Sequence, residues 1–182
     1  VCKKNGFKHF YGAAYNDSLQ VQHIDVPDFK NPELLRCSKY TQSDMTNVYS
    51  EVKRNLLKRE KVLFSGTPCQ VDGLKRFLGK YNEQDLMLIA LVCHGVSSPV
   101  AFARYLQEVE KDNNSSVLGV RFRDKRISNG TLSHRFTTLT LKDGREISST
   151  DDLYTAAFGI GVMDRESCYC CPYASPSGAG DV

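Results

Sequence analysis

Two short apolar segments, each followed by a helix-like segment, constrain the fold more than any other feature of this sequence. Residues 62–64 (VLF) lead to Pro68 and a helical pattern that ends at Gly79. Residues 86–93 (LMLIALVC) form a continuous apolar run, which is typical of a strand covered on both faces. A further helix is predicted after Pro99. This strand–helix–strand–helix order predicts a parallel sheet with right-handed crossovers.

Alternating apolar residues predict strands on both sides of this core. We expect strands at 7–15, 19–26, 117–124, 133–142 and 145–149, and helices from Ser43 or Asp44 to Leu57 and over 152–161. The predicted fold is therefore α/β, with a parallel core sheet, flanking helices and an antiparallel β-rich extension. We expect an α/β core over residues 1–112 and a β-rich extension with a Cys-rich tail over 113–182. One continuous domain is the alternative.

Composition excludes several classes of function. The chain has 24 basic and 21 acidic residues, a net charge of +3, and no block of Lys or Arg, so we expect no nucleic-acid partner. No run of about 18 apolar residues occurs, so no membrane span is predicted. No basic and apolar leader opens the sequence, and we therefore expect a cytoplasmic protein. The charged run over 121–126 is typical of an exposed strand edge.

Seven cysteines are many for a chain of 182 residues. An odd number cannot all pair within one chain, so we expect reduced thiols that act as metal ligands, nucleophiles or small packed side chains. Cys69 lies in the first turn of a predicted helix, and Cys93 ends the apolar run. If the two core strands are neighbours, both thiols meet at the carboxyl edge of the sheet, where ligands gather in such folds.

Cys168 and Cys171 form a C-x-x-C motif, whose spacing lets both sulfurs reach one metal centre. Together with Cys69 and Cys93 they make four thiolates, which is enough for a [4Fe–4S] cluster or a structural zinc. Alone, the motif is also compatible with a zinc half-site, with a redox pair or with a chance occurrence in a chain rich in cysteine. Spacing does not decide whether Cys168 or Cys170 is the metal ligand.

Other candidate groups have two readings each. The turn at 65–67 lacks the Lys-Ser/Thr of a P-loop, and it is either a phosphate cradle built from backbone N–H groups or simply a tight turn. The loop at 39–42 has a composition that suits gripping a flat ring, although most such loops are solvated. His94 is either a cofactor contact or structural. Cys2 and Cys37 have no motif and are expected to be packed or spare thiols.

In combination, these segments resemble the coenzyme F420 hydrogenase/dehydrogenase beta-subunit family. The similarity rests on six segments that follow one another in the family's order: SKYTQSD (38–44), KVLFSGTPCQVDGLKRFLG (61–79), LVCHGVSSPVAFARYL (91–106), VRFRDK (120–125), TLTLKDGREI (138–147) and SCYCCPYA (167–174). The GTPCQ and CHGV-S-P motifs are the most specific part, and the resemblance covers nearly the whole chain.

The resemblance implies a flavin-binding domain that holds FAD beside a [4Fe–4S] cluster. Electrons would pass between the cluster and the flavin, and a hydride between the flavin and F420 or another organic carrier. A redox partner subunit or a ferredoxin-like domain would exchange electrons with the cluster. Matched by position, the cluster ligands are Cys69, Cys93, Cys168 and Cys171. The matched flavin contacts are Ser38, Lys39, Tyr40, Gln42, Ser43, Ser65, Gly66 and Thr67, and we add His94 as a candidate cofactor contact.

The sequence also departs from the family pattern. Cys37 stands where many relatives have Gly, and the amino-terminal ferredoxin-like region and the Gly-Asp-Phe-Trp ending are absent. We therefore expect a fragment that depends on another segment for activity. Two rival functions are a zinc-stapled scaffold domain without redox activity and a thiol enzyme that uses Cys69 as its nucleophile.

Overall fold

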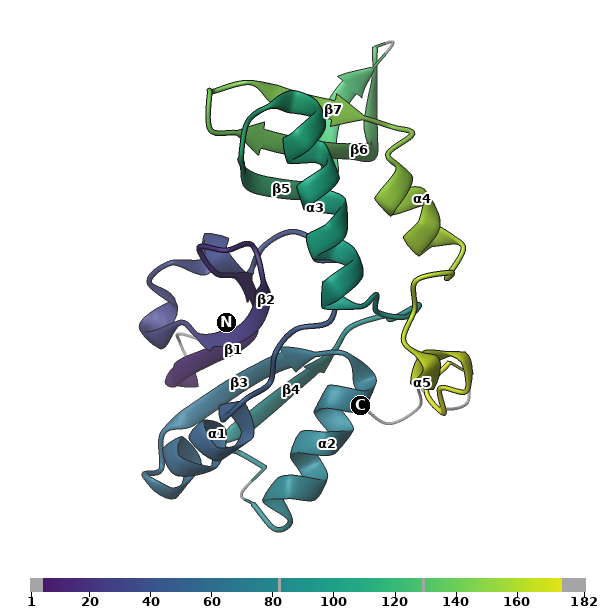
Figure 1. Ribbon diagram of the computed structural model, residues 1–182. Helices are drawn as coiled ribbons and strands as arrows, with labels where there is room; N and C mark the ends of the chain where they lie inside the picture. Colours follow the sequence, from purple (N-terminus) through teal and green to yellow (C-terminus); the bar gives the residue numbers. More distant parts are fainter. Residues whose placement is uncertain (1–4, 82, 129, 175–182) are drawn as a thin grey trace.

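The computed structural model describes residues 5–81, 83–128 and 130–174 (Figure 1). The helices and strands follow one another as β1 (Phe7–Tyr15), β2 (Val21–Asp25), η2 (Pro27–Phe29), η3 (Pro32–Leu35), α1 (Val48–Leu57), β3 (Lys61–Gly66), α2 (Pro68–Leu78), β4 (Leu86–Ala90), α3 (Pro99–Asn113), β5 (Val117–Ser128), β6 (Thr131–Leu141), β7 (Glu146–Ser149), α4 (Leu153–Gly159) and α5 (Glu166–Tyr169).

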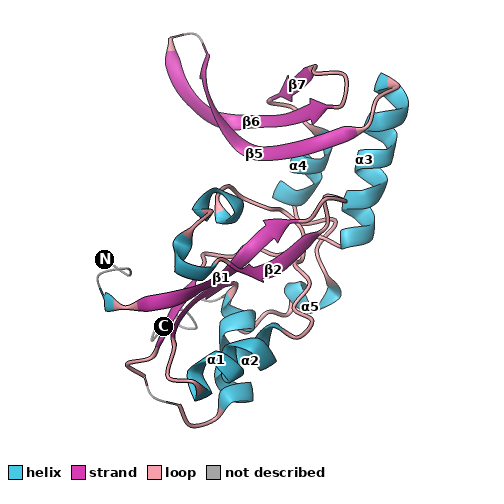
Figure 2. Ribbon diagram, turned by 90° about the vertical axis from the view of Figure 1, so that its left-hand side faces the viewer, coloured by secondary structure: helices cyan, strands magenta, loops and turns pink. Residues whose placement is uncertain are grey.

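Two sheets organise the described residues (Figure 2). The first has the order β2-β1-β3-β4, in which β3 pairs in parallel with β1 and β4, and β2 pairs with β1 antiparallel. The second is an antiparallel sheet in the order β5-β6-β7. The predicted α/β class, with a largely parallel core and an antiparallel extension, is confirmed.

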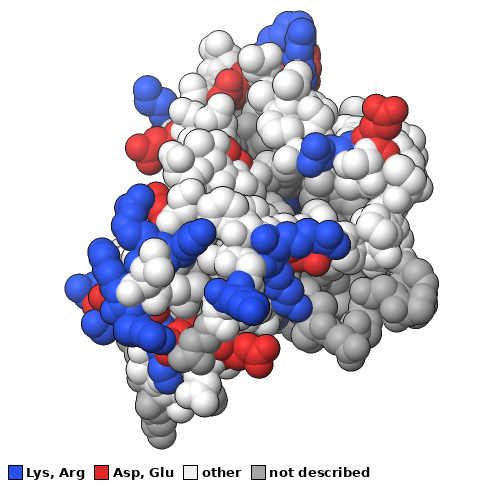
Figure 3. All heavy atoms as spheres, turned by 90° about the horizontal axis from the view of Figure 1, so that it is seen from below, with Lys and Arg blue, Asp and Glu red and all other residues white. Residues whose placement is uncertain are grey.

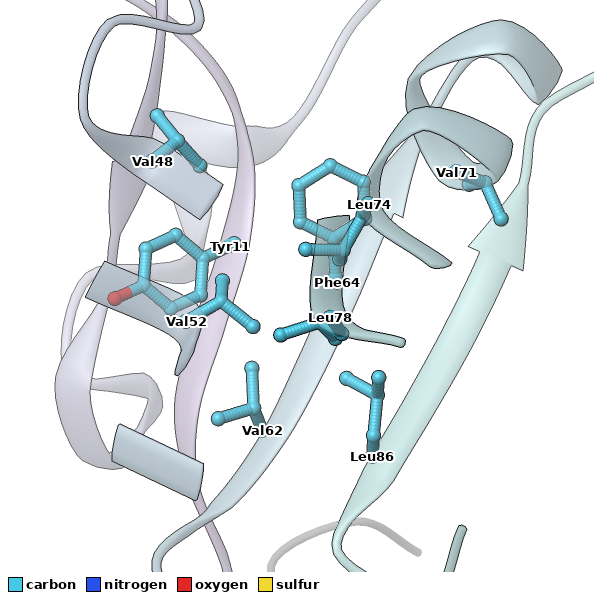
Figure 4. Close-up of a cluster of buried hydrophobic side chains, with 9 residues drawn as sticks. All are labelled: Tyr11, Val48, Val52, Val62, Phe64, Val71, Leu74, Leu78 and Leu86. Carbon is cyan, nitrogen blue, oxygen red and sulfur yellow. The ribbon is translucent and has the colours of Figure 1, made fainter. Parts of the chain in front are cut away.

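The core of the first sheet lies on the face that α1 and α2 cover (Figure 4). Both helices turn an apolar stripe toward the strands, as their sequence spacing predicts. The fully buried members of this cluster include Val52, Val62 and Leu74. The helical spacing of the apolar residues in α1 also predicts that Leu57 completes this stripe. That prediction is wrong, because the Leu57 side chain is 76% exposed.

The prediction for the apolar run at 86–93 is also wrong in one respect. Only Leu86–Ala90 of this run form β4, and residues 91–93 follow it in a loop. β4 is an edge strand of the sheet, and only alternate residues face the core. Met87 and Ile89 point to the other face and are 36% and 41% exposed. The two short helices η2 and η3 pack against β1. They therefore cover a different part of the face to which Met87 and Ile89 point.

The helix α3 lies beside the second sheet (Figure 1). The second sheet has its own apolar cluster, to which α3 contributes side chains. Phe102 and Leu106 of α3 are buried together with Phe122 of β5 and Tyr154 of α4. The division at 112/113 stays a prediction, although α3 was expected to belong to the first part. The strands predicted at 133–142 and 145–149 form the β6–β7 hairpin, whose turn contains Asp143 and Gly144.

One predicted helix start is displaced. We expected α1 to begin at a cap formed by Ser43 or Asp44, but the helix begins after Asn47, which has a left-handed backbone conformation. The Asp44 carboxylate instead accepts hydrogen bonds from the backbone N–H and the hydroxyl of Thr46. The segment before α1 is therefore an extended loop, which leaves Ser43 free to face the interior.

Cations gather at the end of the molecule where α1 and α2 finish (Figure 3). Arg54 lies in the last turn of α1, and Lys75 and Arg76 lie in the last turn of α2. A helix C-terminus carries partial negative charge and favours cations, which explains this accumulation. Within the described residues, no helix is both long and apolar enough to cross a membrane.

Candidate functional site

Four of the cysteines line one cavity of about 190 Å³, which we call the thiol cavity. Its complete lining is Thr67, Pro68, Cys69, Cys93, His94, Gly95, Val96, Cys168, Cys171, Tyr173 and Ala174. These residues come from three segments: the start of α2, the loop after β4, and the tail around α5. The four predicted ligands are therefore neighbours although they are far apart in the sequence.

The parallel pairing of β3 and β4 brings the first two thiols together. Gly66 pairs with Ala90 at the carboxyl ends of these strands. The chain then turns into α2, where Cys69 is the second residue, and into the loop that carries Cys93. The thiol of Cys69 lies 3.2 Å from the hydroxyl of Thr67. Convergence at this edge is what a parallel sheet predicts.

Backbone pairing brings the tail to the same place. The N–H of Arg165 donates to the carbonyl of Val96 at 3.0 Å, and the N–H of Ser98 donates to the carbonyl of Met163 at 3.3 Å. Beyond α5, the hydroxyl of Tyr173 donates to the carboxylate of Asp72 on α2 at 2.6 Å. The Cys168–Cys171 segment is thus held at both ends against the two other thiol-bearing segments.

Gly95 and Asp164 fit together where the tail meets the Cys93 loop. Gly95 has a φ of +130°, and a Cβ atom on it would lie 2.0 Å from the Oδ2 of Asp164. The carboxyl group of Asp164 therefore occupies the space that a side chain at position 95 would fill. Its Oδ1 is buried without a hydrogen-bond partner among the described residues, and burial raises the pKa of this carboxyl group.

The thiols differ in their surroundings. Burial is the main cause that raises the pKa of Cys93, and the nearby sulfurs of Cys69, Cys168 and Cys171 raise it further. Cys170 is exposed and is not part of the cavity lining. Within the described ranges, no three His, Cys, Asp or Glu side chains are arranged to hold a single metal ion. Cys2 lies outside the described residues.

A second cavity of about 440 Å³ adjoins the first, and we call it the polar cavity. Both cavities are lined by Thr67 and Val96. The complete lining of the polar cavity is Ala13, His23, Leu35, Cys37, Ser38, Lys39, Thr41, Ser43, Ser65, Gly66, Thr67, Gln70, Leu91 and Val96. Six of the nine residues predicted to contact a cofactor are among them.

His23, which the sequence analysis missed, anchors a hydrogen-bond chain along this cavity. Its Nε2 lies 2.9 Å from the carbonyl oxygen of Ser65, and its Nδ1 lies 2.8 Å from the hydroxyl of Ser43. The Nε2 of Gln70 donates to the same hydroxyl at 2.9 Å. Because a carbonyl only accepts, Nε2 of His23 carries a proton, and the Ser43 hydroxyl donates to Nδ1 of a neutral ring. Burial lowers the pKa of His23, in agreement with this neutral form.

The start of α2 offers fewer free N–H groups than the sequence analysis assumed. Thr67 and Gln70 form a reciprocal capping box, in which the Gln70 Oε1 accepts from the Thr67 N–H at 2.9 Å. Pro68 has no N–H to offer. The turn at 65–67 therefore uses its own side chains to satisfy groups that a phosphate would otherwise bind.

Lys39 faces the polar cavity from the loop before α1. Its ammonium group donates to the carbonyl oxygens of Arg36 and Cys37 at 2.5 and 3.2 Å. It also lies 5.8 Å from the ring centre of Tyr15. Burial lowers the pKa of Lys39, and the neighbouring Cys37 partly opposes that effect.

Three predicted cofactor contacts lie elsewhere. The ring of Tyr40 stacks on Phe158 with a centroid distance of 4.3 Å and is absent from the lining of the polar cavity. Gln42 donates its backbone N–H to the carbonyl of Ser97. His94 lines the thiol cavity instead. The roles of all nine residues stay predictions.

Comparison with known proteins identifies a family model and a solved structure that resemble this chain. Residues 59–182 match a family model that describes the C-terminal part of the coenzyme F420 hydrogenase/dehydrogenase beta subunit. One similar solved structure comes from the xenon-derivatised F420-reducing [NiFe] hydrogenase complex of Methanosarcina barkeri. It has a TM-score of 0.56 and 16% sequence identity, and the match covers 93% of this chain. The match covers only 55% of that chain, and a search of curated proteins found no match.

Proposed function

Because the chain belongs to the coenzyme F420 hydrogenase/dehydrogenase beta-subunit family, we propose that it is an iron–sulfur flavoprotein oxidoreductase domain. In this proposal the thiol cavity holds a [4Fe–4S] cluster and the polar cavity holds the flavin ring of FAD. Electrons pass between the two, and a hydride passes between the flavin and an organic carrier such as F420. The family supports an oxidoreductase of this type; the cofactors and the carrier are the proposed part.

One observation carries the proposal. Four thiols from three separate segments line one cavity, and that cavity shares Thr67 and Val96 with the polar cavity. Thiolates are the ligands that iron–sulfur clusters and zinc prefer, so the donor set fits a cluster. The shared wall would keep two redox groups close together.

When bound, the cluster supplies one-electron transfer and the flavin supplies hydride transfer. The residues of this chain bind and orient these groups. Cys69, Cys93, Cys168 and Cys171 would ligate iron. The backbone pairing of 96–98 with 163–165 would hold the ligands in register.

The polar cavity has features that suit a flavin ring. His23, Ser43 and Gln70 form a fixed row of polar groups along it, and Ala13 and Leu91 add apolar contacts. Lys39 places a cation at the same cavity, where it would stabilise a negatively charged reduced ring. Flat rings bind in such cavities through apolar walls and a few fixed polar groups.

The electron donor and the hydride carrier would come from outside the domain. The solved relative belongs to an F420-reducing [NiFe] hydrogenase complex, and this chain spans about 55% of that relative's length. We therefore include a redox partner subunit or a ferredoxin-like domain in the proposal, together with F420 or another small organic carrier.

The test is anaerobic reconstitution with iron, sulfide and FAD, followed by elemental analysis and an absorbance spectrum. The proposal predicts about four iron and four sulfide per chain together with bound flavin. A colourless protein that retains zinc and no flavin would identify a zinc-stapled scaffold. Selective alkylation of Cys69 in a protein without metal would identify a thiol enzyme.

A matched set of variants assigns the ligands. Cys69→Ala and Cys171→Ala should each lose most of the iron, because each removes a thiolate from the thiol cavity. Cys170→Ala is the control, since it removes an exposed thiol from the same tail. Equal iron content in all three variants would refute the ligand assignment, and iron loss in Cys170→Ala as well as in the other two variants would move the ligand from Cys168 to Cys170.

A further inference from the structure

A third cavity, of about 670 Å³, opens beside the polar cavity, and we call it the cationic groove. It is lined by Arg36, Cys37 and Ser38 on one side and by residues 121–125 of β5 on the other. Cys37 and Ser38 also line the polar cavity, so the two hollows adjoin at these residues. The charged run at 121–126, expected to be a plain exposed edge, thus forms one wall of a groove.

The cations of this run fall into two groups. Arg121 pairs with Glu146 at 2.8 Å, and Arg126 pairs with Glu146 and Asp124 at 3.0 Å each. Arg123 and Lys125 are exposed, and neither has an ion-pair partner within residues 5–81, 83–128 and 130–174. The same holds for Arg36 across the groove. Ion pairs thus neutralise Arg121 and Arg126, whereas Arg36, Arg123 and Lys125 line the cationic groove without such a partner among the described residues.

Arg123 has a strained backbone that a solvated side chain does not require. Its φ is +53°, within a shift of register between Arg121 and Asp124 where β5 pairs with β6. A bulge of this kind re-aims a side chain, and a left-handed conformation at a non-glycine residue costs of order 1 kcal/mol or more. Such strain is concentrated at functional sites.

The opposite wall is fixed to the same bulge. Ser38 forms an antiparallel bridge with Phe122, the residue before Arg123. The ring of Tyr40 packs on Phe122 with a centroid distance of 4.9 Å. These contacts hold the loop that carries Arg36 against β5, so the cations of both walls lie across one opening.

The groove continues on its far side. Arg123 also lines a fourth cavity, of about 510 Å³, together with Tyr40, Arg135, Thr150, Asp151, Thr155 and Ala156. Neighbouring cavities share residues at each step: Thr67 and Val96, then Cys37 and Ser38, then Arg123. The four cavities therefore form a series of adjoining hollows, which we call the track, from the thiol cavity to the hollow beside Tyr40.

A dinucleotide needs a place for its diphosphate along this track. The start of α2 is a poor candidate because Pro68 lacks an N–H and the Thr67–Gln70 capping box uses others. The cationic groove offers three cations that have no ion-pair partner among the described residues, at the next position along the track. Arg side chains bind phosphate oxygens through two parallel N–H groups, which makes Arg36 and Arg123 suitable partners.

We propose that the diphosphate of FAD binds in the cationic groove between Arg36, Arg123 and Lys125. This inference rests on the proposed flavin function and deepens it by giving the cofactor a direction. The flavin ring lies in the polar cavity, next to the thiol cavity. The adenosine end points toward the hollow beside Tyr40 and Arg135.

The test compares two flavins that share one ring. Riboflavin has no phosphate, whereas FAD has two. Their dissociation constants are measured by fluorescence quenching on the full 182-residue chain. Arg123→Gln should weaken FAD binding roughly 10-fold or more, the usual effect of losing one charge-assisted hydrogen bond, and should change riboflavin binding less than about 2-fold. Inorganic pyrophosphate should compete with FAD and leave riboflavin binding unaffected.

Controls separate this effect from general damage. Arg104→Gln removes an exposed Arg of α3 that lies outside the groove, and it should leave both constants unchanged. The double variant Arg36→Gln/Lys125→Gln tests the groove without altering the strained residue. It should repeat the selective loss of FAD affinity.

Three results would overturn the inference. Unchanged FAD affinity in both groove variants of a protein that binds FAD would refute the cofactor's direction and leave the proposed function standing. Equal weakening of FAD and riboflavin would show a general structural effect. A wild-type chain that binds neither flavin would refute the flavin site itself, and the inference with it.

Discussion

Replacing His23 by glutamine tests the polar cavity at one of its buried polar groups. The side chain is 7% exposed and stacks on Phe64, with a centroid distance of 5.3 Å. The change removes its two hydrogen bonds, to Ser43 and Ser65. Each bond contributes about 1 kcal/mol, and an unpaired buried carbonyl at Ser65 costs about 1–3 kcal/mol more. We expect His23→Gln to lower the free energy of unfolding by about 3–5 kcal/mol near neutral pH.

The loss should depend on pH with a definite sign. Because burial lowers the pKa of His23, the unfolded chain binds a proton at this residue below about pH 6.5 while the folded chain does not. The wild-type free energy of unfolding therefore falls on acidification, by at most about 1.4 kcal/mol per pH unit from this group. The variant lacks this contribution, so the difference between the two proteins should shrink as the pH falls from about 7.5 to 5.5.

Urea unfolding of the metal-free chain across this pH range measures both effects. His94→Gln is the control, because His94 is exposed; its free energy of unfolding should stay within about 0.5 kcal/mol of wild type. A difference between wild type and His23→Gln that is constant with pH, or that grows on acidification, would contradict a neutral buried His23.

Three further changes have predicted outcomes. Gly95→Ala should lower the melting temperature and the iron content after reconstitution, because its Cβ would collide with Asp164, and adding Asp164→Ala should restore part of both. Leu74→Ala should lower the free energy of unfolding by about 2–5 kcal/mol in urea titrations, whereas Leu57→Ala, at an exposed position, should change it by less than about 0.5 kcal/mol. Arg123→Gly should leave the melting temperature unchanged or raise it, because glycine relieves the positive φ, and should still weaken FAD binding; a lower melting temperature would contradict the strain argument.

The order of the core elements could be predicted from the sequence because it depends on local patterns. Pro68 and Gly79 delimit α2, and Gly79 follows its last residue with a φ of +65°. The thiols of Cys69 and Cys93 lie at the same edge because β3 and β4 are parallel neighbours. Their role as ligands stays a prediction.

Other features depend on the neighbours of a segment, which local patterns do not contain. The run at 86–93 is as apolar as a central strand, but β4 has a partner on one side only. His23 occurs in an ordinary alternating strand, and its role appears only when Ser43 and Ser65 lie beside it. The charged run of β5 becomes a groove wall because Ser38 pairs with it.

Anomalous diffraction at the iron absorption edge, from crystals of the anaerobically reconstituted chain, would locate the metal directly. The proposed site predicts a compact iron peak inside the thiol cavity, within bonding distance of Cys69, Cys93, Cys168 and Cys171, and flavin density in the adjoining polar cavity. A zinc peak among these sulfurs, or iron bound at another place with the thiol cavity unoccupied, would contradict it.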